Sequence, residues 1–313
     1  MVSKTKISII TPCLNEKENI TECYTQVKNL FKKLNLDYEH IFTDNKSTDG
    51  TREILKKIAN QDKKVKLIFN TRNFDPFKST FNALKYAKGN AVVLSLAADL
   101  QDPVEIIENF INQWKKGYKV VYGIRKHRKD GFIRGLFRKF FYSLFGFLST
   151  YSYGHNVGEF MLVDSKVHKL LISIEDQFPY IRGIVKYLNF KSIGVEFNQA
   201  QRTKGLSRYS ILSHFPQAIN AFISFSNMPI RFLLYSGFLI SASSILYGIY
   251  LFYRTLMLNE EIVPGIRTLI VSVFILFGIV IFFLGIIGEY IVSIHNHVRK
   301  KPLVVEEEKI NFN

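Results

Sequence analysis

Residues 91–103, AVVLSLAADLQDP, begin as an apolar run of strand length and end in carboxylate and amide side chains. Such a short apolar run, bounded by turn-forming residues, is typical of a strand buried on both faces. Other β-branched and aromatic runs lie before and after it, separated by helical stretches. This alternation predicts an α/β fold with a mostly parallel, doubly wound sheet covered by helices on both faces. The predicted strands are Ile7–Thr11, His40–Thr43, Lys66–Phe69, Ala91–Leu96 and Val120–Tyr122.

Two of the intervening helices carry end signals. Asn15 followed by Glu18 has the spacing of a capping box, which predicts that the first helix starts there. Pro103 suits the first turn of a later helix that runs to about Lys116. Gly117 can then end that helix with a positive φ.

Charge and cysteine content limit the classes of partner. The 313 residues carry a net charge of +16, which favours anionic partners such as phosphorylated substrates and anionic lipid. Nucleic acid is not predicted as a partner, because the cations lie beside apolar aromatic stretches, as they do in segments at a membrane surface.

Cys13 and Cys23 are the two cysteines, and we interpret them as reduced, buried thiols of a cytoplasmic domain. The N-terminal residues lack the long apolar core of a secretory signal.

The chain divides into a first part of mixed polarity and a strongly apolar final third. Residues 1–209 are predicted to form a cytoplasmic domain. Within it, a helix over about 132–150 gathers aromatic residues on one side and arginines on the other, as a helix lying in the membrane interface requires. An ordinary surface helix packed on the sheet is the alternative. A second amphipathic helix is predicted over residues 210–228, next to the membrane.

Two transmembrane helices are predicted within residues 229–295, at Phe232–Tyr253 and Thr268–Ile294. Each is long enough to cross a hydrocarbon layer of about 30 Å. For the remaining tail, residues 296–313, the sequence predicts only a cytoplasmic location and no secondary structure.

The cations around this hairpin predict its orientation. Arg231 precedes the hairpin and Arg299, Lys300 and Lys301 follow it, so the positive-inside rule places both termini in the cytoplasm. Arg254 and Arg267 in the turn between the helices weaken the contrast.

Polar side chains follow four of the predicted strands, at the edge of a parallel sheet where ligands bind. The four segments are Pro12–Glu16, Asp44–Gly50, Ala97–Pro103 and Gly123–Arg125. Each segment alone could be a turn or a helix cap, since Asp, Asn, Ser and Pro favour such positions. Together, at consecutive strand ends, they predict one binding site.

At these segments the sequence resembles the inverting nucleotide-sugar glycosyltransferases of the GT-A fold in family 2. Within them it is most similar to the polyprenyl-phosphate group of dolichyl-phosphate mannose synthases and bactoprenol glucosyltransferases. The resemblance covers nearly the whole chain, in order, and includes the two transmembrane helices. The matching segments are IITPCLNEKENI (9–20), FTDNKSTDGT (42–51), AADLQDP (97–103), YGIRKHRKDG (122–131), NVGEFMLVD (156–164), YIRGIVKYLNF (180–190) and RTKGLSRYS (202–210).

The resemblance implies a donor site for a nucleotide-sugar, most simply a UDP-sugar. Asp44 would accept hydrogen bonds from uracil, and Pro12, Asn15 and Glu16 would line the base and ribose. Asp99 and Gln101 match the metal-binding part of the family's Asp-x-Asp-x-Gln segment. There a divalent ion, Mg²⁺ or Mn²⁺, would bridge to the donor diphosphate, and the oxygen ligands suit those ions.

The resemblance also implies an acceptor site for a polyprenyl phosphate. Glu159 falls where the family has an aspartate beside the acceptor phosphate. The catalytic residues implied are Glu159, Asp99 and Arg125. Cationic and hydroxyl side chains would hold the phosphates of donor and acceptor; they are Arg125, Arg134, Arg202, Ser207 and Arg208.

Three residues depart from the family pattern. Ala97 replaces the first aspartate of Asp-x-Asp, Asn45 replaces a common second aspartate after the second strand, and Glu159 replaces aspartate. The loss at position 97 removes a carboxylate near the metal. Because Mg²⁺ commonly keeps several waters, the expected consequence is weaker metal affinity, with complete loss of activity as the alternative.

The expected reaction is direct attack of the lipid phosphate on the anomeric carbon, with inversion, for cell-envelope glycan modification at the inner membrane. Two other functions compete with it. A processive polysaccharide synthase would usually have a Gln-x-x-Arg-Trp segment, but the one tryptophan, Trp114, is far from any such motif. A catalytically weak or silent GT-A membrane scaffold is supported by Ala97 alone. The sugar, the prenol length and association into a homo-oligomer are left open.

Overall fold

The computed structural model describes residues 5–126, 157–177, 179–200, 228–257, 265–299 and 301–312. The chain forms two compact units: one contains the β-sheet together with the C-terminal segment, and the other contains two long helices. The predicted interfacial helix over 132–150 and residues 210–227 of the predicted juxtamembrane helix lie outside the described residues. The same holds for Arg134, Arg202, Ser207 and Arg208.

The first unit is built on an eight-stranded sheet in the order β7-β5-β6-β4-β1-β2-β3-β8. Six strands are parallel, while β6 and β8 run against their neighbours. All five predicted strands are present, so the α/β prediction of a mostly parallel sheet is confirmed. The strands are β1 Lys6–Cys13, β2 Asp37–Asp44, β3 Val65–Asn70, β4 Ala91–Leu94, β5 Val120–Arg125, β6 Val157–Asp164, β7 Ser192–Phe197 and β8 Glu306–Ile310.

Strand β4 ends two residues earlier than predicted. Ser95 adopts a left-handed backbone with φ of 53°, which no regular strand residue has. The backbone N–H of Leu96 still donates to Ile10 O at 3.0 Å. The chain therefore leaves the sheet at Ser95 while staying attached to β1.

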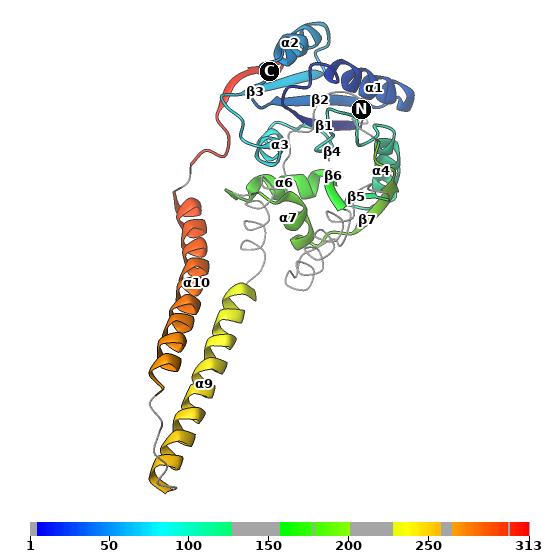
Figure 1. Ribbon diagram of the computed structural model, residues 1–313. Coiled ribbons are helices and arrows are strands. Elements are labelled where there is room, and N and C mark those ends of the chain that lie inside the picture. The colour runs from blue at the N-terminus through cyan, green and yellow to red at the C-terminus, as the bar shows by residue number, and fades with distance from the viewer. Residues whose placement is uncertain are drawn as a thin grey trace. The chain divides into compact units, whose positions relative to one another are not determined.

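Helices cover both faces of the sheet (Figure 1). Apolar side chains of α1, α2 and α4 form one core with the strands, and Phe31, Phe42, Phe69 and Phe110 are among its fully buried members. On the other face, α3 packs against β1 and β2, and α6 packs against β4 and β6. The helices of this unit are α1 Ile20–Leu34, α2 Thr51–Gln61, α3 Pro76–Leu84, α4 Ile106–Lys115, α6 Ser165–Ser173 and α7 Ile181–Tyr187.

The two helix-end predictions have different outcomes. Gly117 has φ of 95° directly after α4, as predicted. The prediction that Asn15 caps the first helix is wrong, because α1 starts at Ile20 and its N-cap residue is Asn19. Asn15 is used elsewhere: its side-chain oxygen accepts a hydrogen bond from the Thr48 backbone at 2.7 Å.

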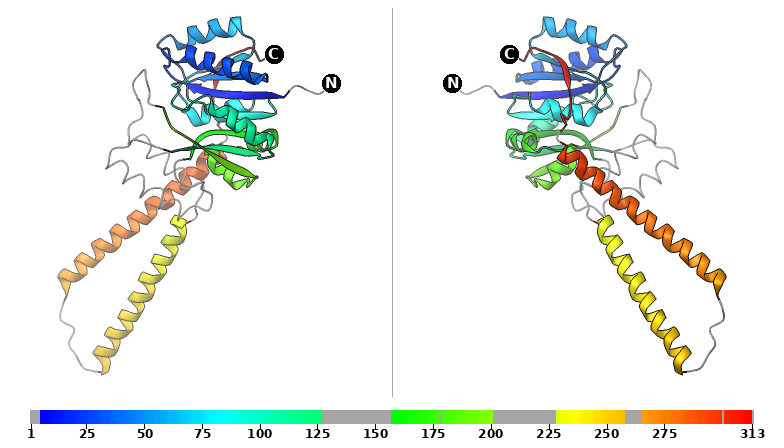
Figure 2. Two further views of the ribbon diagram at one scale, coloured as in Figure 1. Left: turned by 90° about the vertical axis from the view of Figure 1, so that its right-hand side faces the viewer. Right: turned by 90° about the vertical axis from the view of Figure 1, so that its left-hand side faces the viewer.

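The C-terminal tail, for which no secondary structure was predicted, forms the edge strand β8. It pairs antiparallel with β3, with Leu67 opposite Ile310 and Phe69 opposite Glu308. Figure 2 shows this red strand running along the sheet. It satisfies the backbone of an otherwise open edge, and its own side chains, Glu306 to Lys309, are charged.

The second unit contains α9 Met228–Met257 and α10 Ile266–Val298, drawn in yellow and orange in Figure 1. Each has an apolar segment long enough to cross a membrane, Phe232–Tyr250 and Ser272–Asn296, and these segments are not buried within the protein. Large side chains such as Phe238 and Phe274 are exposed. Two long helices with exposed apolar surface suit a hydrocarbon surrounding, and they coincide with the predicted transmembrane helices.

An ion cluster around the buried side chain of Glu39 on β2 gives a first testable prediction. Glu39 is 1% exposed, and its carboxylate contacts Lys66 at 2.8 Å and Lys6 at 2.9 Å. Burial alone would raise the pKa of Glu39, but hydrogen bonds from Lys66 and Ser8 outweigh it and lower the pKa to about 2. Glu39→Gln should lower the free energy of unfolding at neutral pH by about 3 kcal/mol, because it leaves buried Lys66 without a counter-charge.

The pH dependence of unfolding checks the sign of this effect. A carboxylate with a lowered folded-state pKa stabilises the fold above its unfolded pKa, about 4.3 for Glu. That stability is lost as the pH falls towards 2. The difference in unfolding midpoint between the parent protein and Glu39→Gln, measured in detergent, should therefore shrink on acidification. A difference that is absent at pH 7 contradicts the prediction.

Candidate active site

The candidate site lies at the carboxyl ends of the central parallel strands. Strand β1 has β2 on one side and β4 on the other, so the chain order reverses there. In an open α/β sheet this switch point is where ligands bind. Asp44 ends β2, and the loops that follow β1 and β4 carry the other predicted site residues Asn15, Glu16, Asp99 and Gln101.

The loops after β1 and β2 are joined by backbone hydrogen bonds to side chains. Asn15 N–H donates to Ser47 Oγ at 2.8 Å, and Glu16 N–H donates to Thr51 Oγ1 at 3.0 Å. Pro12 lies in register with Thr43 on the neighbouring strand. The predicted base-binding residues therefore come together. The side-chain oxygen of Asn15, however, already accepts the hydrogen bond from Thr48 N–H that joins the two loops.

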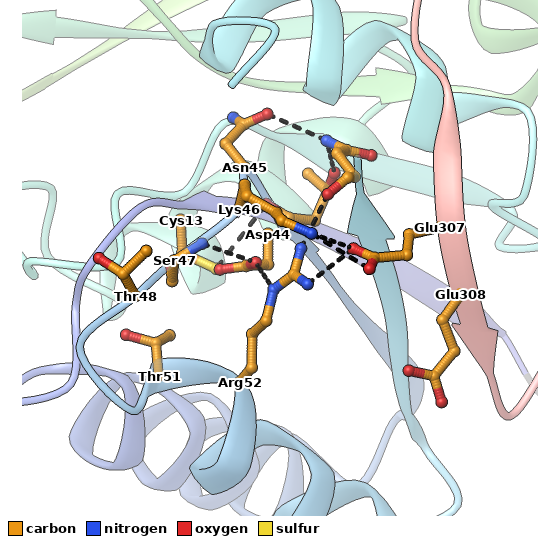
Figure 3. A network of polar contacts seen from close by, with 12 residues as sticks. Cys13, Asp44, Asn45, Lys46, Ser47, Thr48, Thr51, Arg52, Glu307 and Glu308 are labelled. Carbon is orange, nitrogen blue, oxygen red and sulfur yellow. Dashed lines mark hydrogen bonds and ion pairs between the residues drawn. The ribbon is translucent and has the colours of Figure 1, made fainter. Parts of the chain in front are cut away.

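Asp44 is the last residue of β2 and is completely buried. Its Oδ1 accepts hydrogen bonds from Ser47 N–H at 3.1 Å and from Arg52 Nε at 2.5 Å. Figure 3 shows the Arg52 guanidinium reaching Asp44 from α2. The other carboxylate oxygen of Asp44, Oδ2, lies 4.0 Å from Cys13 Sγ. One carboxylate oxygen is thus fixed by the protein, and the other has only a weak sulfur contact among the described residues.

Asn45, one of the departures from the family pattern, has a structural role in this protein. It is buried, and its side-chain oxygen accepts hydrogen bonds from Asn70 Nδ2 and Ser79 Oγ. Its amide nitrogen donates to Asp75 O at 3.3 Å. A carboxylate at this position would bring its charge against the Asp75 carbonyl, so an amide fits here better than the aspartate.

The loop after β4 contains the predicted metal ligands. Asp99 and Gln101 are both partly exposed, and Gln101 N–H donates to Asp99 Oδ1 at 3.2 Å. Leu100 between them has φ of 59°. Burial, with smaller contributions from the charges of Asp99 and Glu16, raises the pKa of the Cys23 thiol on α1 to about 12.

These residues supply oxygen ligands only. Within the described part of the chain, no group of three or more His, Cys, Asp or Glu side chains converges as a complete metal site. An oxygen set of this size fits a hard ion such as Mg²⁺ or Mn²⁺, which takes its other ligands from phosphate and water.

Arg125, at the end of β5, is bound by a residue that the sequence analysis did not single out. Its Nη2 donates to both carboxylate oxygens of Asp102 at 3.0 Å, and its Nε donates to one of them at 3.2 Å. Asp102 is 2% exposed. The guanidinium also packs against Gly158, where a β-carbon would lie 3.4 Å from Arg125 Cζ. Arg125 is therefore held in one orientation beside the Asp99–Asp102 loop.

Glu159 lies on β6, next to the ends of β4 and β5. Arg182 Nε lies 3.5 Å from Glu159 Oε1, and neither carboxylate oxygen has a hydrogen-bond partner among the described residues. Burial raises the pKa of Glu159, while the charges of Arg182 and Arg125 oppose that rise. A carboxylate with a raised pKa and unfilled acceptor sites can take a proton or orient a hydroxyl.

Gln199 and Ala200 contact the same loop. Ala200 N–H donates to Gln101 O at 2.9 Å, and Gln199 Nε2 lies 3.4 Å from Gln101 Oε1. The structure thus brings Asp44, Asp99, Gln101, Arg125 and Glu159 to one edge of the sheet. The four predicted phosphate ligands outside the described residues stay predictions. The sequence analysis did not identify Arg52, Asp102 and Arg182 as site residues. Asp102 and Arg182 lie inside the segments that resemble the family, and this is the signal that could have identified them.

Comparison with known proteins identifies the family. The family model described as glycosyl transferase family 2 matches residues 8–187, which is more than half of the chain. The chain belongs to glycosyl transferase family 2. The GT-A fold and the glycosyltransferase class expected from the sequence are thereby confirmed.

Relatives of this glycosyltransferase match over nearly their full length. The uncharacterized glycosyltransferase YkcC of Bacillus subtilis is 33% identical, over 96% of this chain and 93% of that protein. The bactoprenol glucosyl transferase of Shigella phage SfII is 31% identical, over 95% of this chain and 96% of that protein. Among solved structures, a complex of glucosyl-3-phosphoglycerate synthase from Mycobacterium tuberculosis with Mn²⁺, UDP-glucose and phosphoglyceric acid has a TM-score of 0.48, at 17% identity, covering 71% of this chain and 79% of that one.

Proposed function

We propose that this glycosyltransferase moves a sugar from a UDP-sugar to a polyprenyl phosphate, with inversion at the anomeric carbon. The observation that carries the proposal is the gathering of Asp44, Asp99, Gln101, Arg125 and Glu159 at one edge of the sheet. The names of several relatives support the acceptor, because they are called bactoprenol glucosyl transferases.

The donor occupies the part of the site around β1 and β2. Asp44 Oδ2 accepts the imide N–H of uracil, while Oδ1 stays bound to Arg52 and Ser47. The loop of Pro12, Asn15 and Glu16 lines the base and ribose. A divalent ion held by Asp99 and Gln101 would neutralise charge on the departing diphosphate.

The acceptor occupies the part of the site around β5 and β6. Its phosphate is already an anion at neutral pH, so one of its oxygens attacks the anomeric carbon directly. The bond from that carbon to the donor diphosphate breaks, and UDP leaves from the opposite face. Glu159 orients the phosphate or takes its residual proton. Arg125, together with Arg134, Arg202, Ser207 and Arg208, supplies charge and hydrogen bonds to the two anionic substrates.

The helices α9 and α10 are proposed to anchor the enzyme where its lipid acceptor is confined. A polyprenyl chain leaves a bilayer only at high cost, so the site must lie at the headgroup level. We place the enzyme in the inner membrane, with the catalytic domain and both termini on the cytoplasmic side, and its product in cell-envelope glycan modification. Residues 1–209, joined by the C-terminal strand β8, form the proposed catalytic part, and residues 229–295 form the proposed membrane part.

The experiment that tests this function is reconstitution of the full chain in nanodiscs with undecaprenyl phosphate. UDP-glucose, UDP-galactose, UDP-N-acetylhexosamines and a GDP-sugar are supplied in separate reactions, with and without EDTA. Mass spectrometry of the organic extract should find a prenyl-phosphate sugar with one UDP-sugar, and less of it with EDTA. UDP binding without any transfer would favour the silent scaffold that Ala97 suggests. Transfer from the GDP-sugar alone would contradict the donor.

A further inference from the structure

The C-terminal strand contributes a side chain to the surroundings of Asp44. Glu307 on β8 accepts hydrogen bonds from Lys46 Nζ at 2.9 Å and from Arg52 Nη1 at 2.8 Å. Figure 3 shows these two cations between Glu307 and Asp44. No role in nucleotide binding was predicted for the tail, and its residues carry no family motif.

Arg52 is fixed by three strands at once. Its Nε donates to Asp44 on β2, its Nη2 donates to Asn70 O on β3 at 2.8 Å, and its Nη1 donates to Glu307 on β8. Its guanidinium carbon also lies 4.9 Å from the centre of the Phe69 ring. A planar guanidinium with all its nitrogens engaged has one orientation. Without Glu307, one of these restraints is lost and Arg52 can rotate away from Asp44.

We propose that Glu307 is a positioning residue for base recognition: it holds Arg52 against Asp44 Oδ1, so that Oδ2 is presented to the uracil of the donor. The inference rests on the proposed function, in which Asp44 binds the base. It adds that the nucleotide site is completed by the strand that follows the second apolar helix in the chain.

The energetics favour a positioning role over a stabilising one. The side chain of Glu307 is 43% exposed, and exposed ion pairs contribute little to folding. Hydrogen bonds from Arg52 and Lys46 lower the pKa of Glu307 to about 2, so the carboxylate stays charged across the physiological range. Asp44, by contrast, is completely buried, and a buried carboxylate is sensitive to where its cationic partner, here Arg52, points.

A matched pair of variants separates these roles. Glu307→Gln keeps the shape and removes the charge that binds Arg52. Glu308→Gln is the control, because Glu308 lies next in the same strand but pairs with Lys56 at 2.6 Å, away from Asp44. Both are made in the full chain, in nanodiscs, and their thermal unfolding midpoints are recorded to confirm that each is folded.

The decisive measurement compares UDP with inorganic pyrophosphate, which lacks the base, by calorimetric titration in the presence of Mn²⁺. For Glu307→Gln we expect the Kd for UDP to rise about tenfold and the Kd for pyrophosphate to stay unchanged. In transfer assays KM for the donor should rise by a similar factor, with kcat changed less than twofold. Glu308→Gln should match the parent protein in every measurement.

Three results would overturn the inference. UDP affinity that is unchanged or tighter in Glu307→Gln would mean that Glu307 does not orient Asp44. Equal weakening of UDP and pyrophosphate would assign the effect to the diphosphate end of the site. The same weakening in Glu308→Gln would make it a general property of the strand. A parent protein that binds no UDP at all would refute the proposed donor itself, which is a distinct outcome.

Discussion

Asp99→Ala should reduce formation of the lipid-linked sugar by at least about a thousandfold, close to the background of the assay. The metal on a departing diphosphate contributes several kcal/mol of transition-state stabilisation, and about 4 kcal/mol corresponds to this factor. Ala97 has already removed one carboxylate from this segment. Asp99 is therefore the one carboxylate left among the proposed ligands, and no neighbour in the proposed set can replace it.

Radiolabelled sugar transfer into organic-extractable lipid measures this effect, with Mn²⁺ and Mg²⁺ titrated in each case. Glu105→Gln is a suitable control, since Glu105 is an exposed carboxylate just before α4. It should retain full activity and the parent metal dependence. Turnover of Asp99→Ala within tenfold of the parent enzyme, insensitive to EDTA, would exclude the assigned metal site.

Glu159→Gln should lower kcat by about a hundredfold or more, which is the usual contribution of a positioned acid–base group. Glu159→Asp keeps a carboxylate and should retain most of the activity. The glutamine keeps the size of the buried side chain but cannot take a proton. A kcat for Glu159→Gln equal to that of the parent enzyme would remove Glu159 from the chemistry.

The pH profile gives an independent check on Glu159. Burial raises the pKa of its carboxyl above the usual value, against the opposing charges of Arg182 and Arg125. A base works in its deprotonated form, so kcat should fall with acidification at a pH above the ordinary glutamate pKa of about 4.3. This acid limb should be missing from the profile of Glu159→Gln. An identical limb in both enzymes would assign it to another group, such as the acceptor phosphate.

Local sequence patterns predicted the central part of the fold. The runs Ile7–Thr11 and His40–Thr43 lie on observed strands, and Ala91–Leu96 does so up to Leu94. Strand burial leaves a continuous apolar run that is visible without knowledge of the neighbours. Gly117 ends its helix as predicted, since a positive φ is a local requirement. Asn15 was wrongly taken as a helix cap, because its side chain bonds to Thr48 across two loops.

The elements that escaped prediction depend on distant partners. Strand β6 lies between β4 and β5 and runs against both, and its place follows from pairing and not from its own composition. Asn45 appeared to be a lost carboxylate, but its contacts with Asn70 and Asp75 make it part of the buried framework. The role of Arg125 as a site cation stays a prediction, and its partner Asp102 became apparent only in three dimensions.

The sequence by itself determined the order of the elements and the presence of two long apolar helices. It also determined the strand ends near which Asp44, Asp99 and Arg125 lie. Each of these features depends on residues that are neighbours in the chain. Only the tertiary structure decided that the charged tail closes the sheet edge and that Glu307 reaches Arg52, 255 positions earlier in the chain. That contact depends on the register of β8 against β3. Register between distant strands is set by the packing of the whole domain, so no local pattern in the tail could have indicated it.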